Sequence, residues 1–222
     1  MVRRILALGD THFPYHSQRA LEKVYRLADD LQPTHVVQVG DLYDQFGFSR
    51  YPKVLKMEPE KELELARAAA EKMWSHLKGV NCYQLMGNHD DRALKRALSS
   101  APELASLVGN SLRELYTFPG VATKPDSREE LALGHIIVQH GHRSKLGDHA
   151  KYNQHCTIVG HSHTGGVVFF PKRKNTIWEL NCGFLADITG PAFGYHAQKK
   201  FHTTTLGVGW VDGLGPRFIP IK

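Results

Sequence analysis

Five short polar clusters in this chain carry residue types that bind metal ions. They are Gly9-Asp10-Thr11-His12, Gly40-Asp41-Leu42-Tyr43-Asp44, Gly87-Asn88-His89-Asp90, His140-Gly141-His142 and Gly160-His161-Ser162-His163. Carboxylates, imidazoles and one amide are nitrogen and oxygen donors that suit manganese, iron, zinc or nickel better than calcium or a thiolate-bound metal. The clusters therefore indicate a site for divalent transition-metal ions.

The spacing within the clusters favours two ions. Alternate side chains of an extended segment point the same way, so Asp10 and His12 can reach one ion, and His161 and His163 have the same spacing. Asp41 could place one carboxylate oxygen on each of two ions about 3.5–4 Å apart, so that both grip a bridging hydroxide. This is the arrangement of a two-metal hydrolytic site.

Each cluster follows a segment that is expected to be a strand. Four of these segments are apolar and rich in β-branched residues, and the fifth is mixed: residues 5–8, 36–39, 136–138, 158–159 and 83–86. Side chains at strand ends converge on one rim of a sheet, where open α/β folds place their chemistry.

The order of elements predicts an α/β protein. The first half alternates strands at 3–8, 35–39 and 80–86 with helices at about 17–31 and 59–77, whereas the second half has shorter strands at 167–170, 176–180 and near 205–211. We expect two packed sheets flanked by helices. The length of 222 residues requires only one domain, residues 1–222.

Composition limits the setting and the partners. The net charge of +6 and a pI near 9.2 favour an anionic partner such as nucleic acid, a nucleotide or another phosphate ester, although a solvated basic surface would have the same charge. Cys82, Cys156 and Cys182 form no paired motif, so we expect small buried side chains in a reducing compartment. No apolar run approaches the ~18 residues of a membrane span, and we expect a cytoplasmic protein.

The ordered clusters resemble the calcineurin-like metallophosphoesterases, whose pattern is D-x-H, G-D-x-x-D, G-N-H-[DE], H and G-H-x-H. The match runs from Asp10 to His163 with no cluster missing. The resemblance implies a four-layer α/β/β/α sandwich with two mixed sheets. It also implies that Asp10, His12 and His163 bind one metal, that Asn88, His140 and His161 bind the other, and that Asp41 bridges the two.

The same resemblance assigns the catalytic pair. His89 would protonate or stabilise the leaving-group oxygen, and Asp44 would orient its imidazole. A hydroxide held by two divalent ions, manganese first and iron, zinc or nickel as alternatives, would attack phosphorus in line.

The family includes protein phosphatases, nucleotidases, cyclic-nucleotide phosphodiesterases and nucleases, and fold alone does not choose among these substrates. Serine/threonine phosphatases read G-D-x-V-D-R-G, and this chain has Gln45 in place of the arginine that clamps a monoester. Gly-Asp-Leu-Tyr-Asp looks more like the nuclease-type branch and phage-encoded relatives. We therefore expect a phosphodiesterase acting on nucleic acid, DNA or RNA, or on nucleotides. The alternatives are a phosphomonoesterase or nucleotidase and, less favoured because His89 and Asp44 are present, a non-catalytic interaction scaffold.

Several residues near the clusters could have either a structural role or a role in the site. Asp90 is expected to cap the helix that begins near Asp91. His16 and His142 lie beside the clusters and could either contact the substrate or the metal ligands, or have no role in the site. The connection 43–58, with four aromatic and three cationic residues, could stack on a nucleotide strand or be anchored on a sheet edge by its aromatics. Two basic groups could follow a phosphate backbone or be solvated: Arg92, Lys95 and Arg96, and Lys172-Arg173-Lys174. Four aromatic residues late in the chain could belong to the core or to an interface: Phe184, Phe193, Tyr195 and Phe201.

Overall fold

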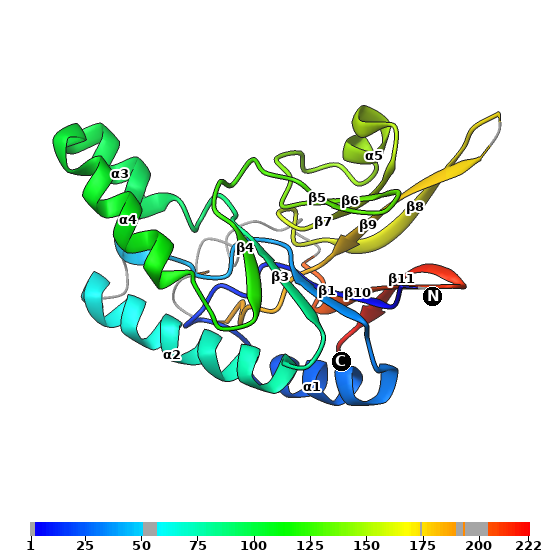
Figure 1. Ribbon diagram of the computed structural model, residues 1–222, viewed down its shortest axis with the longest axis horizontal. Coiled ribbons are helices and arrows are strands. Elements are labelled where there is room, and N and C mark those ends of the chain that lie inside the picture. Colours follow the sequence, from blue (N-terminus) through cyan, green and yellow to red (C-terminus); the bar gives the residue numbers. More distant parts are fainter. Residues whose placement is uncertain (1–2, 51–56, 174, 190–192, 194–203) are drawn as a thin grey trace.

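Two β-sheets packed face to face form the centre of the protein (Figure 1). The computed structural model describes residues 3–50, 57–173, 175–189, 193 and 204–222. The first sheet has the order β11-β10-β1-β2-β3-β4, in which β1 to β4 are parallel and β10 and β11 run antiparallel to their neighbours. Its strands are β1 (Ile5–Leu8), β2 (His35–Gln38), β3 (Asn81–Leu85), β4 (Val121–Lys124), β10 (Gly207–Asp212) and β11 (Gly215–Pro220).

The second sheet has the order β5-β6-β7-β9-β8. Its three central strands are parallel, and both edge strands pair antiparallel. The strands are β5 (Leu131–Leu133), β6 (Ile136–Gln139), β7 (Cys156–Val159), β8 (Gly165–Pro171) and β9 (Thr176–Cys182). Both sheets are thus mixed, which confirms the predicted fold class.

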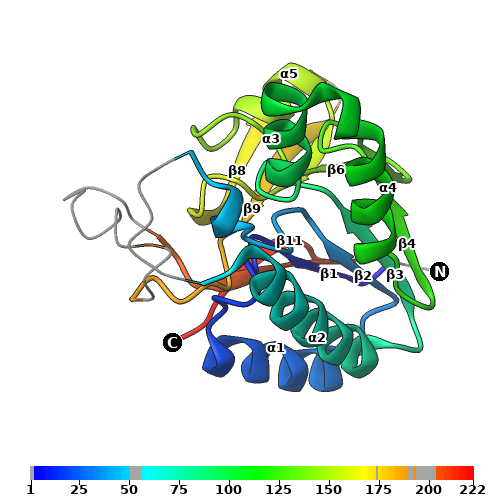
Figure 2. The same ribbon diagram turned by 90° about the vertical axis from the view of Figure 1, so that its left-hand side faces the viewer.

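Helices cover the outer faces of this sandwich. Figure 2 shows α1 (Gln18–Leu31) and α2 (Pro59–Leu77) side by side under the first sheet and α5 (Asp148–Asn153) beyond the second. The helical pair α3 (Arg92–Ser100) and α4 (Ala105–Leu115) projects at one end (Figure 1). Two short 3-10 helices complete the described elements, η1 (Phe46–Phe48) and η2 (Pro102–Leu104).

Local sequence explains the two long helices. Ser17 caps α1, since its side chain accepts a hydrogen bond from the Ala20 backbone N–H. Pro59 opens α2 with Glu60 and Glu62 in the first turn, as favoured at a helix N-terminus, and a face of buried apolar residues ends at Leu77. The bounds predicted for α2 are confirmed, and those for α1 differ by one residue.

Strand β1 shows how the sheets divide the core. Successive side chains of a strand point to opposite faces, so Leu6 and Leu8 pack with α1 and α2, whereas Ile5 and Ala7 pack against the second sheet. All four are fully buried. The three cysteines are also free and buried within these two clusters, as predicted. No helix among the described residues is long and apolar enough to cross a membrane.

Candidate metal and catalytic site

The five clusters follow β1, β2, β3, β6 and β7, as expected, but these strands belong to two sheets. The first three clusters extend from the first sheet and the last two from the second. The expectation of one rim of a single sheet was therefore wrong. The clusters meet at the seam between the sheets, because parallel strands of both sheets end at the same side of the sandwich (Figure 1).

The backbone at the site is left-handed rather than extended. Of the eight non-glycine residues with positive φ in the described part of the chain, five are predicted ligands: Asp10 (48°), His12 (52°), Asp41 (53°), His161 (67°) and His163 (58°). Asp10 and His12 therefore come together through tight turns, and the strand-alternation argument for them was wrong. Such conformations disfavour ordinary side chains and concentrate at functional sites.

The first group of donors consists of Asp10, His12 and His163. The Nε2 atoms of His12 and His163 are 3.4 Å apart, and Asp10 Oδ1 lies 3.4 Å from His163 Nε2 and 4.0 Å from His12 Nε2. All three side chains are buried. One carboxylate oxygen and two imidazole nitrogens thus face a common point where they could hold an ion.

The second group consists of Asn88, His140 and His161. Asn88 Oδ1 lies 2.8 Å from His161 Nδ1 and 3.1 Å from His140 Nε2. The other ring nitrogen of His140 lies 3.0 Å from the Val39 carbonyl oxygen, which fixes the orientation of the ring.

Asp41 lies between the two groups. Its Oδ2 atom is 3.4 Å from His140 Nε2 and 3.9 Å from His12 Nε2, while Oδ1 accepts a hydrogen bond from the His89 backbone N–H. A single oxygen therefore faces both groups, where one oxygen toward each was expected. Gly87 permits this position, because a Cβ atom there would lie 2.1 Å from Asp41 Oδ1.

The charges of the site suit cations. Burial acts to raise the pKa of Asp10 and of Asp41, but neighbouring histidines lower both pKa values below the ordinary value. Burial alone would lower the pKa of His140, but Asp41 and Asp10 raise it to about 10. Two ionised carboxylates in a buried cluster are costly unless positive charge balances them, which protonated His140 does in part and bound cations would do further. The donor set thus fits divalent ions.

Asp44 and His89 lie beside the first group. Asp44 Oδ2 is 3.0 Å from His12 Nδ1 and 3.4 Å from His89 Nδ1. These are close polar contacts, and neither Nδ1 atom has a well-aligned hydrogen bond within the described residues. His89 Nε2 is directed to the other side and lies 3.9 Å from Asp41 Oδ2. The Nδ1 atom of His89 thus faces Asp44, and its Nε2 atom faces the centre of the site.

A family model described as calcineurin-like phosphoesterase matches residues 3–211. The chain belongs to this family. It is thereby a metal-dependent phosphoester hydrolase, and its His/Asp groups are able to hold a metal. The chain is similar to the Gene 54 proteins of Mycobacterium phages L5 and D29, with 29% and 27% identity over 100% of this chain and 94% of each relative. A metallophosphoesterase from Sphaerobacter thermophilus shares the fold at a TM-score of 0.50 and 16% identity, over 100% of this chain and 89% of that one.

Asp90 of this calcineurin-like phosphoesterase does not cap α3, so that prediction was wrong. Its carboxylate is fully buried and accepts hydrogen bonds from the backbone N–H groups of Leu42, Tyr43 and Gly87 and from the Tyr116 hydroxyl. The N-cap residue of α3 is Asp91, whose side chain makes no capping bond. Asp90 instead ties the loop that carries Asp41 to the loop that carries Asn88.

A second buried carboxylate holds the His140 loop. Glu179 on β9 accepts hydrogen bonds from the backbone N–H groups of Gly147, His149 and Ala150 at the start of α5. His149 Nε2 in turn accepts from the N–H groups of His142 and Arg143. Burial, His142 and Arg143 together lower the pKa of His149 to about 4, so the ring stays neutral. His149 is thus a structural anchor.

His16 and His142, which could either take part in the site or not, lie away from the metal-donor contacts described above. The His142 ring packs edge-on against His149, and His16 contacts the Pro14 carbonyl oxygen and Gln18 Oε1. Aromatic rings adjoin the first donor group instead. Phe184 stacks on His163 and Phe193 meets His12 edge-on, with centroid distances of 5.2 Å in both pairs. Both phenylalanines are core residues, while Tyr195 and Phe201 lie outside the described residues.

The connection after Asp44 is anchored by its aromatics where the structure describes it. Tyr43 and Phe46 are buried, and the Tyr43 hydroxyl donates to the Leu115 carbonyl oxygen. This favours anchoring over stacking on a nucleotide for these two residues. Residues 51–56 lie outside the described part.

The predicted basic residues separate into two places. Arg92 lies at the predicted catalytic pair, where Nη1 donates to Asp44 Oδ1, and Lys95 pairs with Asp91. Lys172 and Arg173 follow β8, whose seven residues lead away from His163, so they lie at the opposite end of this strand (Figure 1). Their expected position near the site was wrong, and Lys174 lies outside the described residues.

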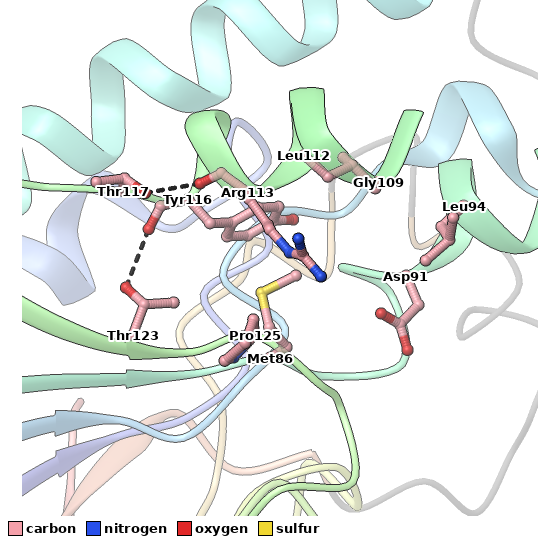
Figure 3. Close-up of a pocket in the computed structure, with 10 residues that line it drawn as sticks. All are labelled: Met86, Asp91, Leu94, Gly109, Leu112, Arg113, Tyr116, Thr117, Thr123 and Pro125. Carbon is pink, nitrogen blue, oxygen red and sulfur yellow. Dashed lines mark hydrogen bonds between the residues drawn. The ribbon is translucent and has the colours of Figure 1, made fainter. Parts of the chain in front are cut away.

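A cavity of about 270 Å³ lies between α3, α4 and β4 (Figure 3). Arg113 points into it toward Met86 and Asp91, and one face is the Tyr116 ring. None of the predicted ligands or catalytic residues lines this cavity. Tyr116, which lines the cavity, also donates a hydrogen bond to Asp90.

Proposed function

We propose that this calcineurin-like phosphoesterase is a dinuclear metal-dependent phosphodiesterase that hydrolyses phosphodiester bonds of nucleic acid or nucleotides. The observation that carries this proposal is the position of Asp41 Oδ2, which faces a donor group on either side. A carboxylate between two sets of nitrogen and oxygen donors is what a pair of divalent ions requires.

The proposed ligands follow from the two groups. Asp10, His12 and His163 would hold one ion and Asn88, His140 and His161 the other, with Asp41 shared. Bound ions would supply Lewis-acid activation of water and neutralise charge on the phosphoryl oxygens, and manganese is the ion we expect.

His89 is the proposed acid toward the leaving group. Its Nε2 atom faces the centre of the site, and Asp44 lies behind its Nδ1 atom and lowers the freedom of the ring to turn. An imidazole held in this way can donate a proton to the oxygen that departs from phosphorus. The same carboxylate adjoins His12, so Asp44 would position a metal ligand and the acid together.

The preference for diesters rests on the loop after Asp41 and on charge. Gln45 replaces the arginine of monoester-specific phosphatases and is fully buried, and the net charge of +6 favours polyanionic substrates. Arg92 favours the alternative, a phosphomonoesterase or nucleotidase, because it brings a guanidinium to the catalytic pair from another element. The interaction-scaffold alternative has less support, since His89 and Asp44 are both in place.

Hydrolysis of a bis-aryl phosphodiester and of the mono-aryl ester in manganese tests the order of these alternatives. We expect a higher kcat/KM for the diester, and a clear monoester preference would reverse the ranking. Profiling against single-stranded DNA, double-stranded DNA, RNA and cyclic nucleotides would then identify the natural class.

The His89→Asn variant tests the acid. We expect bound metal to be retained and kcat to fall about 10²–10⁴-fold, the usual contribution of acid–base catalysis. His76→Asn, on the exposed side of α2, is the matched control and should behave as the wild type. An unchanged rate for His89→Asn would show that another group is the acid.

A further inference from the structure

Arg92, the first residue of α3, reaches back to the proposed catalytic pair. Its Nη1 atom donates to Asp44 Oδ1 and to the Asp44 backbone carbonyl oxygen, each at 2.9 Å. Its Nη2 atom lies 2.9 Å from His89 Nε2. The side chain is 21% exposed, so one side of the guanidinium remains open to solvent while the other is fixed.

These contacts set the direction of the guanidinium. Two acceptors on Asp44 hold Nη1, and because the group is planar, they also fix where Nη2 points. His89 Nε2 is the ring atom that faces Asp41 Oδ2 and the centre of the site. An oxygen that approaches His89 Nε2 therefore comes within reach of Nη2 as well.

Gln45 explains why α3 presents Arg92 at this position. Its Nε2 atom donates to the Asp90 carbonyl oxygen and to the Tyr116 hydroxyl, and its Oε1 atom accepts from the Ala93 backbone N–H. Gln45 thus anchors the first turn of α3 and itself points away from the donor groups. The loop residue positions the helix, and the helix supplies the arginine.

We propose that Arg92 binds a phosphoryl oxygen of the substrate on the leaving-group side, next to His89. This inference rests on the proposed phosphoesterase function and deepens it. When substrate enters, the phosphoryl oxygen replaces His89 Nε2 as the acceptor for Nη2, while Nη1 stays on Asp44. Nε2 is then free to hold a proton, taken up from solvent, that His89 gives to the leaving group. A guanidinium is the side chain best matched to phosphoryl oxygens, and its charge opposes the negative charge that develops as the ester bond breaks.

Arg92→Gln and Arg92→Lys test this role, with Arg19→Gln as a matched control in the first turn of another helix. We would measure the Kd of inorganic phosphate for the manganese-loaded protein, metal content, and kcat and KM for the bis-aryl diester. We expect Arg92→Gln to bind phosphate about 10–100-fold more weakly, the worth of a charged hydrogen bond, with unchanged metal content. Arg92→Lys should fall in between, and Arg19→Gln should match the wild type.

The outcomes separate the two proposals. Phosphate binding by Arg92→Gln equal to that of Arg19→Gln, with only kcat reduced, would mean that Arg92 merely positions Asp44 and would overturn substrate contact. A wild type without turnover of any phosphoester would overturn the proposed function itself. Thermal melting of each variant checks folding, and Arg92→Lys decides the matter should Arg92→Gln fail to fold.

Discussion

Asp90 is the residue that most clearly joins the site to the rest of the molecule. It lies directly after Asn88 and His89, yet its four hydrogen bonds go to two loops and to Tyr116. Burial and the nearby Asp41 charge raise the pKa of Asp90 to about 7. Asp90 therefore holds the backbone of these loops in place, and its carboxylate oxygens are occupied by hydrogen bonds instead of facing an ion.

Asp90→Ala should destabilise the protein strongly. It leaves three backbone N–H groups and one hydroxyl without an acceptor, and each buried unsatisfied group costs about 1–3 kcal/mol, partly recovered by entering water. We expect the free energy of unfolding in urea to fall by about 3 kcal/mol or more. Asp91→Ala, whose side chain is partly exposed, should change it by less than about 1 kcal/mol, and equal effects would contradict this account.

The sequence revealed the residues that could bind ions but not those that support them. Asp10, His12 and the other donors stand in short clusters with recognisable spacing. Arg92 bonds to Asp44, 48 positions away, and Asp90 bonds to Tyr43, 47 positions away. No local pattern indicates such pairings. In the sequence, Arg92 is one of several basic residues on the helix after Asp90. Its partner became evident once β2 and β3 placed their loops side by side.

Among the elements, α2 supports the loop after Asp44 through Glu62. This buried carboxylate accepts hydrogen bonds from the backbone N–H groups of Phe46 and Gly47, the first two residues of η1. Asp44 lies only two residues before η1. Helix α2, which the sequence predicts from its proline start and apolar face, thus also positions the segment after Asp44.

Glu62→Ala should loosen this segment. Loss of two buried acceptors is expected to lower the free energy of unfolding by about 2–4 kcal/mol, and kcat should fall because Asp44 is less well held. Thermal melting and diester turnover would measure both effects. Glu60→Ala, an exposed position on the same helix, should leave both unchanged, and a normal kcat in Glu62→Ala would show that Asp44 is held independently.

The α5 turn predicts a pH dependence of stability. The pKa of His149 is about 4 in the folded protein and 6.5 when unfolded, so the unfolded chain binds the proton first as pH falls. His149 therefore stabilises fully above pH 6.5 and progressively less between pH 6.5 and 4. The groups that face this ring are Glu179, at 3.8 Å, together with His142, Arg143, Asp148 and His161.

His149→Gln should remove this component, since an amide oxygen can accept the same N–H groups and does not titrate. We expect the difference in unfolding free energy between wild type and variant to change between pH 6.5 and 4 and to be flat above it. Urea unfolding across this range measures the difference, and a constant offset at every pH would rule out His149 as the titrating group.

At the scale of the whole molecule, sequence periodicity predicted the helices and strands where these elements are long. The βαβαβ half was predicted because α2 begins at a proline and has an apolar face, and because β1 to β3 alternate with the two helices. Strands β4, β5 and β11 were missed. The first two have only four and three residues, and their pairing depends on neighbours distant in sequence. The division of the clusters between two sheets was hidden for the same reason.

Metal should stabilise the whole protein, because proposed ligands come from both sheets. Ion binding at 100 times the Kd adds about 2.7 kcal/mol, which for a chain of this size corresponds to roughly 5–10 °C in Tm. We expect such a rise when manganese is added after chelation. Asp41→Asn should abolish most of it and Asp126→Asn, at an exposed turn, none of it. An equal Tm with chelator and with manganese would count against the proposed ions.

The left-handed backbone at five donor positions also indicates how such a centre would decay by mutation. Asparagine tolerates this conformation better than most residues, so replacing Asp10 with asparagine relieves local strain, keeps an oxygen that can accept the His161 N–H and removes a buried charge. An inactivated descendant altered in this way would tolerate heat at least as well as its ion-free ancestor. Loss of catalysis here would therefore leave no trace in the fold, and only the inability to retain cations would reveal it.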